Sequence, residues 1–438
     1  MNYKETIQFL FSSLPMYQRD GKAAYKSNLN NTYVLDKALN HPHTKFKSIH
    51  IAGTNGKGSV SHMLASVFQA AGYKTGLYTS PHLLDFRERI RINGEKITEQ
   101  AVVDFVERIE PVIRKIHPSF FEMTVAMAFD YFANEEVDIA LIETGMGGRL
   151  DSTNIIQPVI SVITSISMDH SEFLGNTLSR IAEEKCGIIK HNTPLISVSD
   201  PPEVKESILQ AAESKKAKVF WANELWAFTY QMQSMNNTSL FHYHKVLMNA
   251  EEVFESDLTG SYQAENLSIA LTTFDLLSEN GWKIEKVHIS EGLASVKKRT
   301  SLLGRWDILG ANPRIICDTA HNSEGIQAVF NQLKEIPAKR LHVIWGMVSE
   351  KNPETILPLL PKNALYYFTQ PSVPRRMPVE KLEAVAHDAG LKGNTFTDVK
   401  AAYDAAIAAA EPEDTVFIGG STFVAADLYA FLKPDIPR

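Results

Sequence analysis

The sequence has very little cysteine and no surplus of positive charge. Only Cys186 and Cys317 occur among 438 residues, which excludes a disulfide scaffold and predicts two buried free thiols in a reducing compartment. The chain has 44 Lys and Arg residues against 51 Asp and Glu residues, a net charge of −7. Because nucleic-acid binders usually carry a basic surplus, we expect no nucleic-acid partner.

Long hydrophobic runs are also missing. No stretch approaches the roughly 18 apolar residues that a membrane-spanning helix needs, so no membrane association is expected. The first residues place Lys4 and Glu5 before a short apolar run and lack the small-residue cleavage site of a signal peptide. A cytoplasmic location is therefore expected.

The sequence does contain short apolar runs that alternate with longer amphipathic ones. This alternation predicts an α/β fold with mainly parallel sheets, and runs that are apolar throughout predict strands covered by helices on both faces. In the first half, strands are predicted at residues 46–52, 75–79, 137–143, 159–166 and 195–198. Helices are predicted there at residues 57–71, 99–116, 122–134 and 178–188.

The pattern changes twice after residue 225. Two strand-like runs flank the polar tip Met235-Asn236-Asn237, which predicts a small antiparallel insertion near residues 225–256. Helices follow at 262–278 and 284–294, and a second α/β series begins after a basic stretch. Its strands are predicted at residues 305–309, 314–318, 340–345, 364–368 and 415–418. We predict a first domain over residues 1–297, a linker over 298–302, and a smaller Rossmann-like α/β domain over 303–438.

The most informative segment leads from an apolar strand through a glycine-rich turn into a helix. Such a turn directs several backbone N–H groups and a helix N-terminus at one point, where they can bind phosphate. Lys57 can then reach the β- and γ-phosphates, and Ser59 can approach phosphate or Mg²⁺. The common phosphate loop has Gly six residues before its Lys and Ser or Thr directly after it. Here Ile51 and Gly58 occupy those positions, so a plain glycine-rich turn is the alternative.

Three strand ends supply candidates for a metal site. Glu143 ends a buried-type strand, as metal-binding acids of nucleotide enzymes do, although a lone strand-end Glu is more often a surface acid. Ser80 and His170 follow two other strands; a lone Ser there is most often a turn former, and a lone His is usually structural. Since Mg²⁺ prefers oxygen ligands, Ser80 and Glu143 suit it better than His170 does.

Nine segments, in order along most of the chain, together resemble the folylpolyglutamate synthase/dihydrofolate synthase family of the Mur ligase group. They are GTNGKGS (53–59), TSPHL (79–83), ERIRING (88–94), ETGMGGRLDSTN (143–154), SMDH (167–170), IAEEKCGIIK (181–190), GRWD (304–307), DTAHN (318–322) and GGSTFVAADL (419–428). The resemblance implies an ATP- and Mg²⁺-dependent ligase that joins L-glutamate to the carboxylate of tetrahydrofolate, and also to dihydropteroate, through an acyl phosphate. It also implies a P-loop ATPase domain of the Mur type followed by a glutamate ligase domain.

The resemblance assigns roles to residues of these segments. The ATP-binding residues would be Gly53, Thr54, Asn55, Gly56, Lys57, Gly58, Ser59, Asn266, Arg305, Asp318 and His321, with Asn322 in the same cleft. Ser80 and Glu143 would bind one Mg²⁺, and Glu143 with His170 a second. Lys57, Glu143, His170 and Lys185 would be the catalytic residues. Lys185 would carry a carbamate; the alternative is an ordinary helix lysine in salt-bridge reach of Glu183 or Glu184.

The resemblance also implies a folate side and a glutamate side of the site. Residues 81–91 resemble the family's flexible loop beside the pterin pocket, with Asp151 close by. Within that loop, His82 is a substrate candidate, and Arg87, Arg89 and Arg91 could attract an acidic substrate, although alternating charge is usually only a solvated strand. Ser421 and residues 375–378 are candidates for binding glutamate. Asn352 departs from the family, which more often has Asp at this position.

Two other functions remain possible from the sequence. One is a different amide ligase of the same architecture, such as a muramyl ligase. The other is a nucleotide-dependent switch, although the chain has no N-K-x-D motif for guanine. A monomer is expected, and whether the chain acts on both folate and dihydropteroate is open.

Overall fold

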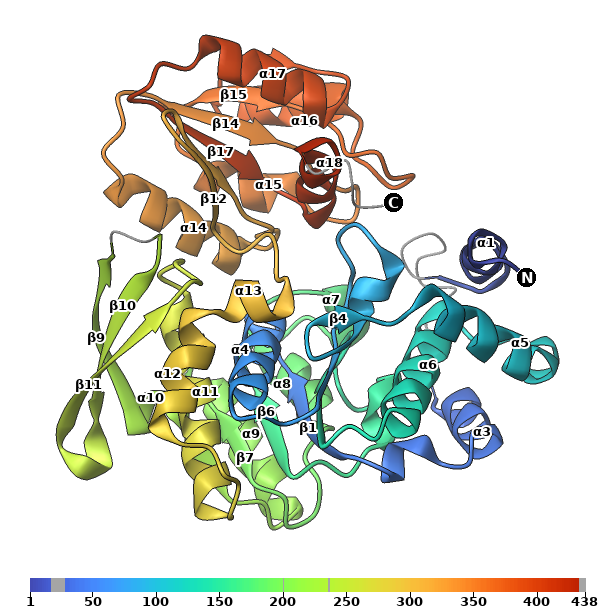
Figure 1. Cartoon of the computed structure of the whole chain (residues 1–438). Coiled ribbons are helices and arrows are strands. Elements are labelled where there is room, and N and C mark those ends of the chain that lie inside the picture. Colours follow the sequence, from blue (N-terminus) through green and yellow to red (C-terminus); the bar gives the residue numbers. More distant parts are fainter. Residues whose placement is uncertain (17–27, 200, 235–236, 433–438) are drawn as a thin grey trace.

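The computed structural model describes residues 1–16, 28–199, 201–234 and 237–432. Figure 1 shows two α/β units, one from the N-terminal part of the chain (blue to yellow, below) and one from the C-terminal part (orange to red, above). The predicted α/β fold with mainly parallel sheets is confirmed. Among the described residues, no helix combines the length and apolar character needed to cross a membrane. Cys186 and Cys317 are buried and unpaired, as predicted.

The N-terminal unit is built on an eight-stranded sheet. Its strands are β1 (Lys47–Ala52), β2 (Thr75–Tyr78), β3 (Ile90–Ile92), β4 (Glu95–Lys96), β5 (Ile139–Glu143), β6 (Ile160–Ile163), β7 (Leu195–Ser197) and β8 (Val219–Trp221). Their order is β4-β3-β2-β5-β1-β6-β7-β8; β3 runs antiparallel to both of its neighbours, β2 and β4, and the other pairs are parallel. The carboxyl ends of β1, β2, β5 and β6 therefore meet at one edge, where the functional segments begin.

Helices cover both faces of this sheet. They are α1 (Tyr3–Ser13), α3 (Asn30–Ala38), η2 (Pro42–Thr44), α4 (Lys57–Ala70), η3 (Phe86–Arg89), α5 (Glu99–Ile116), α6 (Phe120–Asn134), η4 (Ser152–Ile155), α7 (Ser171–Leu174), α8 (Leu178–Cys186), α9 (Pro202–Ser214), α10 (Ala222–Leu225), α11 (Gln263–Glu279), α12 (Lys286–Ala294) and α13 (Val296–Thr300). The strands and helices predicted in the first half are confirmed, each to within three residues at either end. Short edge strands such as β4 and β8 were not predicted, because two or three residues carry no readable alternation.

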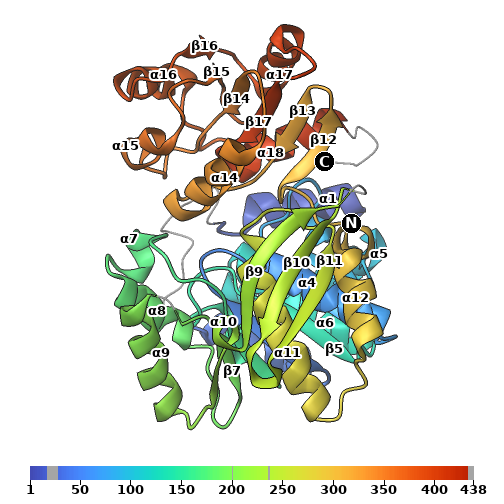
Figure 2. The same cartoon turned by 90° about the vertical axis from the view of Figure 1, so that its left-hand side faces the viewer.

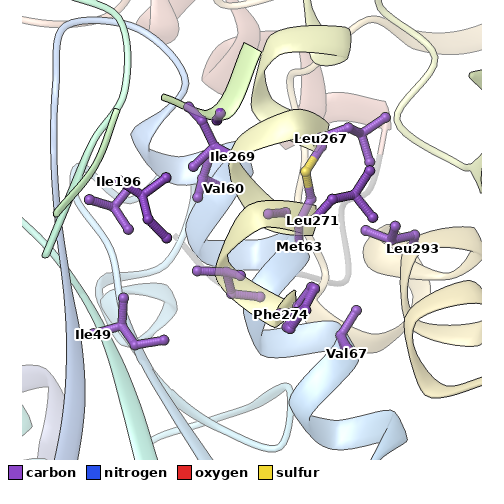
Figure 3. Close-up of a cluster of buried hydrophobic side chains, with 14 of the residues drawn as sticks. Ile49, Val60, Met63, Val67, Ile196, Leu267, Ile269, Leu271, Phe274 and Leu293 are labelled. Atoms are coloured by element: carbon purple, nitrogen blue, oxygen red, sulfur yellow. The ribbon is translucent and has the colours of Figure 1, made fainter. Parts of the chain in front are cut away.

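Alternate residues of the central strands face different cores. In β5, Ile139 and Leu141 belong to a cluster with α4, α11 and α12, whereas Ala140 and Ile142 belong to one with α5 and α6. Figure 3 shows the first cluster, with Met63 of α4 beside Leu267 and Leu271 of α11, and Val60 beside Ile269. Burial on both faces explains why these strands are apolar almost throughout.

One stability prediction arises from this core. Ile269 is fully buried in the cluster of Figure 3, so Ile269→Val removes one methylene-sized group from a packed interior. We expect it to lower the free energy of unfolding by about 1 kcal/mol. The matched control is Val287→Ala on α12, whose side chain is 50% exposed and is expected to have little effect. Chemical denaturation measures the free energy of unfolding of both variants. An equal decrease in both would contradict the tight packing of Ile269 in the core.

The predicted antiparallel insertion is confirmed over its described residues. It consists of β9 (Trp226–Gln233), β10 (Ser239–Lys245) and β11 (Ala250–Ser256), with η5 (Val246–Met248) joining the last two. Figure 2 shows this sheet in front of α11. Tyr243 donates a hydrogen bond to the carbonyl of Ala264 at 2.5 Å, which ties the sheet to the start of α11. Met235 and Asn236 of the predicted tip lie outside the described residues.

The C-terminal unit contains a six-stranded sheet. Its strands are β12 (Asp307–Ala311), β13 (Arg314–Cys317), β14 (Leu341–Trp345), β15 (Leu365–Phe368), β16 (Gly393–Thr395) and β17 (Thr415–Gly419), in the order β12-β13-β17-β14-β15-β16. Its helices are α14 (Ser323–Glu335), α15 (Pro353–Ile356), η6 (Leu357–Leu359), α16 (Val379–Asp388), α17 (Val399–Ala409) and α18 (Thr422–Leu432). Only β12 is antiparallel to its neighbour.

The strand predicted at residues 305–309 begins two residues later than expected. Gly304 and Trp306 both have positive φ values, 74° and 49°, which a β-strand does not allow. The intervening Arg305 therefore lies in a turn and lines the space between the two units, not a face of the sheet.

Candidate active site

Two cavities lie where the units meet. The larger one, about 680 Å³, is lined by the glycine-rich loop of the N-terminal unit and by residues 318–329 and Arg305 of the C-terminal unit. The smaller one, about 270 Å³, lies beside it. Ser80, His170 and His321 line both cavities, so a molecule bound in one can meet a molecule bound in the other at these residues.

The loop between β1 and α4 needs glycine at two positions. Gly53 and Gly56 have φ values of 149° and 88°, and a Cβ on either would overlap a neighbouring side chain, Thr164 or Asn266. Thr164 donates to the carbonyl of Asn55 at 2.6 Å and holds the turn. Helix α4 begins at Lys57, and the free N–H groups of its first turn line the larger cavity. This geometry is that of a phosphate-binding loop.

Lys57 is held on the loop itself. Its Nζ donates to the carbonyls of Gly53 and Thr54, both at 3.1 Å. The ammonium group therefore lies at the wall of the cavity, close to the N-terminus of α4, where an anion is attracted by both.

Glu143 lies next to the loop because β5 and β1 are parallel neighbours, with Glu143 opposite Ile51. Its carboxylate accepts a hydrogen bond from the backbone N–H of Ser80 at 3.2 Å. Burial raises the pKa of Glu143 above its usual value, while Lys57 and the other neighbouring cations act in the opposite direction. A buried carboxylate beside a phosphate loop is a suitable ligand for a divalent cation.

Lys185 is buried below the same loop. Its Nζ donates to the carbonyl of Gly53 at 2.6 Å, and no carboxylate of the described residues lies within 4.0 Å of it. Glu184, one of the two partners considered from the sequence, instead pairs with Arg149 at 2.8 Å. Burial and the charge of Lys57 lower the pKa of Lys185 to about 7. The side chain is therefore a buried amine and not a surface salt-bridge lysine.

A charged cluster centred on Asp169 connects the two units. Lys351 of the C-terminal unit donates to Asp169 at 2.6 Å, and the imidazoles of His170 and His321 lie 3.8 and 3.9 Å from the same carboxylate. Burial alone would raise the pKa of Asp169, but the neighbouring His170, Lys351 and His321 hold it well below its usual value. Burial lowers the pKa of both histidines to about 4.

The sequence did not identify Asp169 and Lys351 as partners. They are separated by 182 residues, and no pattern links them. The only available signal was the position of Asp169 directly before His170 at the end of a buried strand.

The glycine-rich loop also touches the C-terminal unit directly. Asn55 donates to Glu324 at 2.6 Å and accepts from Asn322 at 2.9 Å. Glu324 is another residue that the sequence did not single out. These contacts, with the pair of Asp169 and Lys351, hold the C-terminal unit over the loop.

The remaining predicted nucleotide residues line the larger cavity together with the loop. Asp318 accepts from the Tyr262 hydroxyl at 2.5 Å and from two backbone N–H groups at 2.8 Å each. Asn266 donates to Gln263 at 2.8 Å, which in turn donates to the hydroxyl of Ser59 at 3.2 Å. The structure thus brings Asp318 and Asn266 to one cavity with the loop, as their predicted roles require.

The smaller cavity is lined by candidates for the substrate side. Asp151 lies in its wall, with its carboxylate accepting from Gly145 N at 2.8 Å, Met146 N at 3.0 Å and the Thr153 hydroxyl at 2.6 Å. These bonds give Asp151 the role of holding the wall in shape. Ser421, at the start of α18, lies across the cavity.

His82 and Arg87 are not brought to the walls of either cavity in the part of the chain that the structure describes. The guanidinium of Arg87 pairs with Asp85 at 2.8 Å and with Glu99 at 3.4 Å. His82 accepts from Arg89 at 2.8 Å, and it is Arg89 that lines the smaller cavity. The segment predicted as a flexible loop includes η3 and the start of β3. The positive charge of Arg87, which the sequence suggested for an acidic substrate, is instead paired with acidic side chains of the same region.

Comparison with known proteins agrees with this arrangement. A family model described as the Mur ligase middle domain matches residues 51–274, and one described as Mur ligase, glutamate ligase domain, matches residues 304–422. The folylpolyglutamate synthase of Lacticaseibacillus casei is 31% identical, with 97% of each chain covered. The chain belongs to the folylpolyglutamate synthase/dihydrofolate synthase family of Mur ligases.

Solved structures of this family have the same fold. Escherichia coli FolC, in complex with DHPP and ADP, aligns with a TM-score of 0.86 at 28% identity, over 99% of this chain and 98% of that one. A bifunctional folylpolyglutamate synthase/dihydrofolate synthase of Yersinia pestis, complexed with AMPPNP and a Mn ion, aligns with a TM-score of 0.82 at 25% identity, over 99% and 98%. As a member of this family, the protein is an ATP-dependent ligase that forms an amide with glutamate.

Proposed function

We propose that this family member joins L-glutamate to the carboxylate of tetrahydrofolate and also of dihydropteroate, with conversion of ATP to ADP and phosphate. The observation that carries the proposal is the junction of the two cavities at Ser80, His170 and His321. A nucleotide in the larger cavity would direct its terminal phosphate at this junction, and an acid in the smaller cavity would direct its carboxylate there.

The chemistry follows from the poor leaving ability of a carboxylate oxygen. The folate carboxylate attacks the γ-phosphate and forms an acyl phosphate, and the amine of glutamate then attacks the acyl carbon and expels phosphate. Lys57 and the N–H groups of the loop stabilise the charge that develops during phosphoryl transfer. The acyl phosphate would hydrolyse in open water, and the contacts of Asn55 and Asp169 with the C-terminal unit would hold that unit over the site and limit the access of water.

For the nucleotide, we propose the loop residues Gly53 to Ser59 as the phosphate site. Other residues that line the larger cavity would hold the rest of ATP. The proposed residues are Asn266, Arg305, Asp318 and His321.

The residues present fit a divalent cation. A buried carboxylate, the hydroxyl groups of Ser59 and Ser80, and the imidazole of His170 line one cavity with the phosphate loop. We propose Ser80 and Glu143 as ligands of one Mg²⁺ and Glu143 with His170 as ligands of a second. Bound there, Mg²⁺ would neutralise part of the charge of the transferring phosphate.

Lys185 is proposed to carry a carbamate, formed when its neutral amine attacks CO₂ and releases a proton. The modified nitrogen keeps one hydrogen for the bond to Gly53. Because the pKa of Lys185 is lowered to about 7, the amine is mostly neutral at pH 8 and mostly protonated at pH 6. Activity in bicarbonate buffer is therefore expected to rise several-fold from pH 6 to pH 8. At a given pH, activity is expected to be lower in CO₂-depleted buffer than in bicarbonate buffer.

The measurement for Lys185 is ¹³C NMR of protein in ¹³C-bicarbonate. A carbamate resonance is expected in the wild type and not in Lys185→Met. Equal turnover with and without CO₂, together with no resonance, would show that the lysine is unmodified.

For glutamate, we propose Ser421 and Arg375 as contacts in the smaller cavity, where both line the wall. Arg89 and Asp151 would line the folate side, with His82 holding Arg89 in place. We do not extend the proposal to Arg87, because it lines neither cavity and its guanidinium is paired with Asp85 and Glu99.

Three further predictions about the whole chain stand as proposals. We expect the protein to act as a monomer. Residues 298–302 remain the proposed linker; they contain the end of α13 and the turn at Ser301. The buried, unpaired cysteines are consistent with the cytoplasm, where we expect the protein to act.

The test of the proposed function is phosphate release by the purified chain with ATP, Mg²⁺ and glutamate. Dihydropteroate, tetrahydrofolate and no acceptor are compared. Release with both acceptors is expected, and release with tetrahydrofolate alone would reduce the function to polyglutamylation. Release with neither acceptor would overturn the proposal in favour of another amide ligase.

A further inference from the structure

Three metal-ligating side chains form a cluster away from the cleft, in the connection between α3 and β1. Asp36 lies in the last turn of α3, and its two carboxylate oxygens are each 2.6 Å from an imidazole nitrogen, Nδ1 of His41 and Nδ1 of His43. One ligand atom from each residue can be chosen so that all three lie within 4.8 Å of one another. The segment between Asn30 and Lys47 plays no part in the proposed reaction.

The backbone of this connection is shaped to bring the histidines back to the helix. Asn40 and His41 both have left-handed conformations, with φ values of 60° and 52°. Such conformations are uncommon for residues other than glycine. The N–H of His41 donates to the carbonyl of Asp36 at 2.9 Å, which closes the turn. Both imidazoles are thereby directed at one carboxylate.

The chemistry of the three groups suits a particular class of cation. Two imidazole nitrogens and one carboxylate oxygen are ligands for Zn²⁺ and similar divalent transition metals, whereas Mg²⁺ prefers oxygen alone. Ligand atoms around tetrahedral zinc are roughly 3.3 Å apart, so a pair of ligand atoms at the 4.8 Å limit would have to approach by about 1.5 Å. The partial negative charge at the C-terminus of α3 also favours a cation there.

The carboxylate of the cluster is buried, whereas its histidines are partly exposed to solvent. The side chain of Asp36 is 4% exposed, whereas those of His41 and His43 are 57% and 18% exposed. The carboxylate is therefore held inside the protein, while His41 gives access from solvent and leaves room for water as a fourth ligand.

We propose that Asp36, His41 and His43 form a binding site for one Zn²⁺ ion or a divalent transition metal of the same ligand preference. The site is separate from the catalytic cleft: β1 runs away from it towards Gly53, and α3 lies at the lower right of Figure 1, far from the C-terminal unit. A bound ion joins the end of α3 to η2, and both elements pack on α6. It therefore stabilises the N-terminal region and takes no part in amide formation.

The experiment uses the full chain and zinc chloride as the probe. Zinc content is measured by mass spectrometry of the metal after gel filtration, and affinity by competition with a chromophoric zinc chelator. The variants are His41→Ala with His43→Ala, Asp36→Asn, and His170→Ala, which removes the imidazole of the cleft. The matched control is His117→Ala with His387→Ala, which removes two exposed histidines elsewhere.

The wild type, the matched control and His170→Ala are expected to bind one equivalent of zinc more than the His41/His43 double variant. Asp36→Asn is expected to bind at least tenfold more weakly. Zinc should raise the unfolding temperature of the wild type and leave that of the double variant unchanged, with phosphate release equal in both. Circular dichroism checks folding, and if the double variant does not fold, the exposed His41→Ala alone replaces it. Equal zinc content in the wild type and in the variants of Asp36 and His41 overturns the proposal.

Discussion

Replacing Lys57 with alanine is expected to lower the rate of phosphate release about a thousandfold, equivalent to about 4 kcal/mol of transition-state stabilisation. The ammonium group lies on the phosphate loop, 3.1 Å from the carbonyls of Gly53 and Thr54, at the N-terminus of α4. Lys185 is not placed to replace it, because it is buried behind the loop and donates to Gly53. Steady-state phosphate release at saturating ATP and Mg²⁺ measures the effect.

The fold is expected to survive this substitution. Lys57 is only partly buried, and both of its hydrogen bonds are to carbonyls of its own loop. Lys334→Ala, on an exposed position of α14, serves as the matched control and should retain full activity. Wild-type turnover by a folded Lys57→Ala protein is incompatible with the proposed phosphate site.

Replacing Glu143 with alanine is expected to cost at least about 2 kcal/mol of transition-state stabilisation, or about a thirtyfold loss of rate. Its carboxylate is buried at the end of β5, beside the phosphate loop and the backbone N–H of Ser80. Because Glu143 is proposed as a ligand of both Mg²⁺ ions, the loss should be accompanied by a higher Mg²⁺ requirement. The measurement is phosphate release as a function of Mg²⁺ concentration.

Two further variants separate charge from packing at this position. Glu143→Gln keeps the shape of the side chain and should lose activity almost as Glu143→Ala does, because a neutral amide is a poor ligand. Glu335→Ala, at an exposed position of α14, removes an unrelated carboxylate and should be neutral. A rate unchanged at saturating Mg²⁺ in Glu143→Ala refutes the metal role.

Much of the fold could be predicted because the strands of the N-terminal sheet are buried on both faces. β1, β5 and β6 are apolar almost throughout, and the helices between them have clear periodicity. The glycine-rich loop was equally readable, since Gly53, Gly56 and Lys57 are neighbours in the chain. The late start of β12 was not predicted, because a positive φ is uncommon for a residue such as Trp306 and cannot be read from the residue type.

The substrate residues were harder to predict than the phosphate loop. Arg87 looked available for an acidic substrate, but Asp85 and Glu99 lie close enough to pair with it. For Lys185 the sequence left an ordinary helix lysine open as the alternative to a carbamate carrier, and only the packing of α8 shows that its side chain is buried under Gly53. In both cases the decisive neighbour is a side chain or a carbonyl whose position depends on packing and not on a local pattern.

The sequence by itself determined the α/β class, the phosphate loop and the family. Each of them is recognised from short contiguous segments, in which the order of residue types sets the local backbone structure. Only the tertiary structure decided which distant groups meet. The contact between Asp169 and Lys351, the approach of Glu324 to Asn55, and the burial of Lys185 all join elements far apart in the chain. Their pKa shifts and pairings arise from burial and from charges brought together by folding, and neither is a property of a residue in its sequence alone.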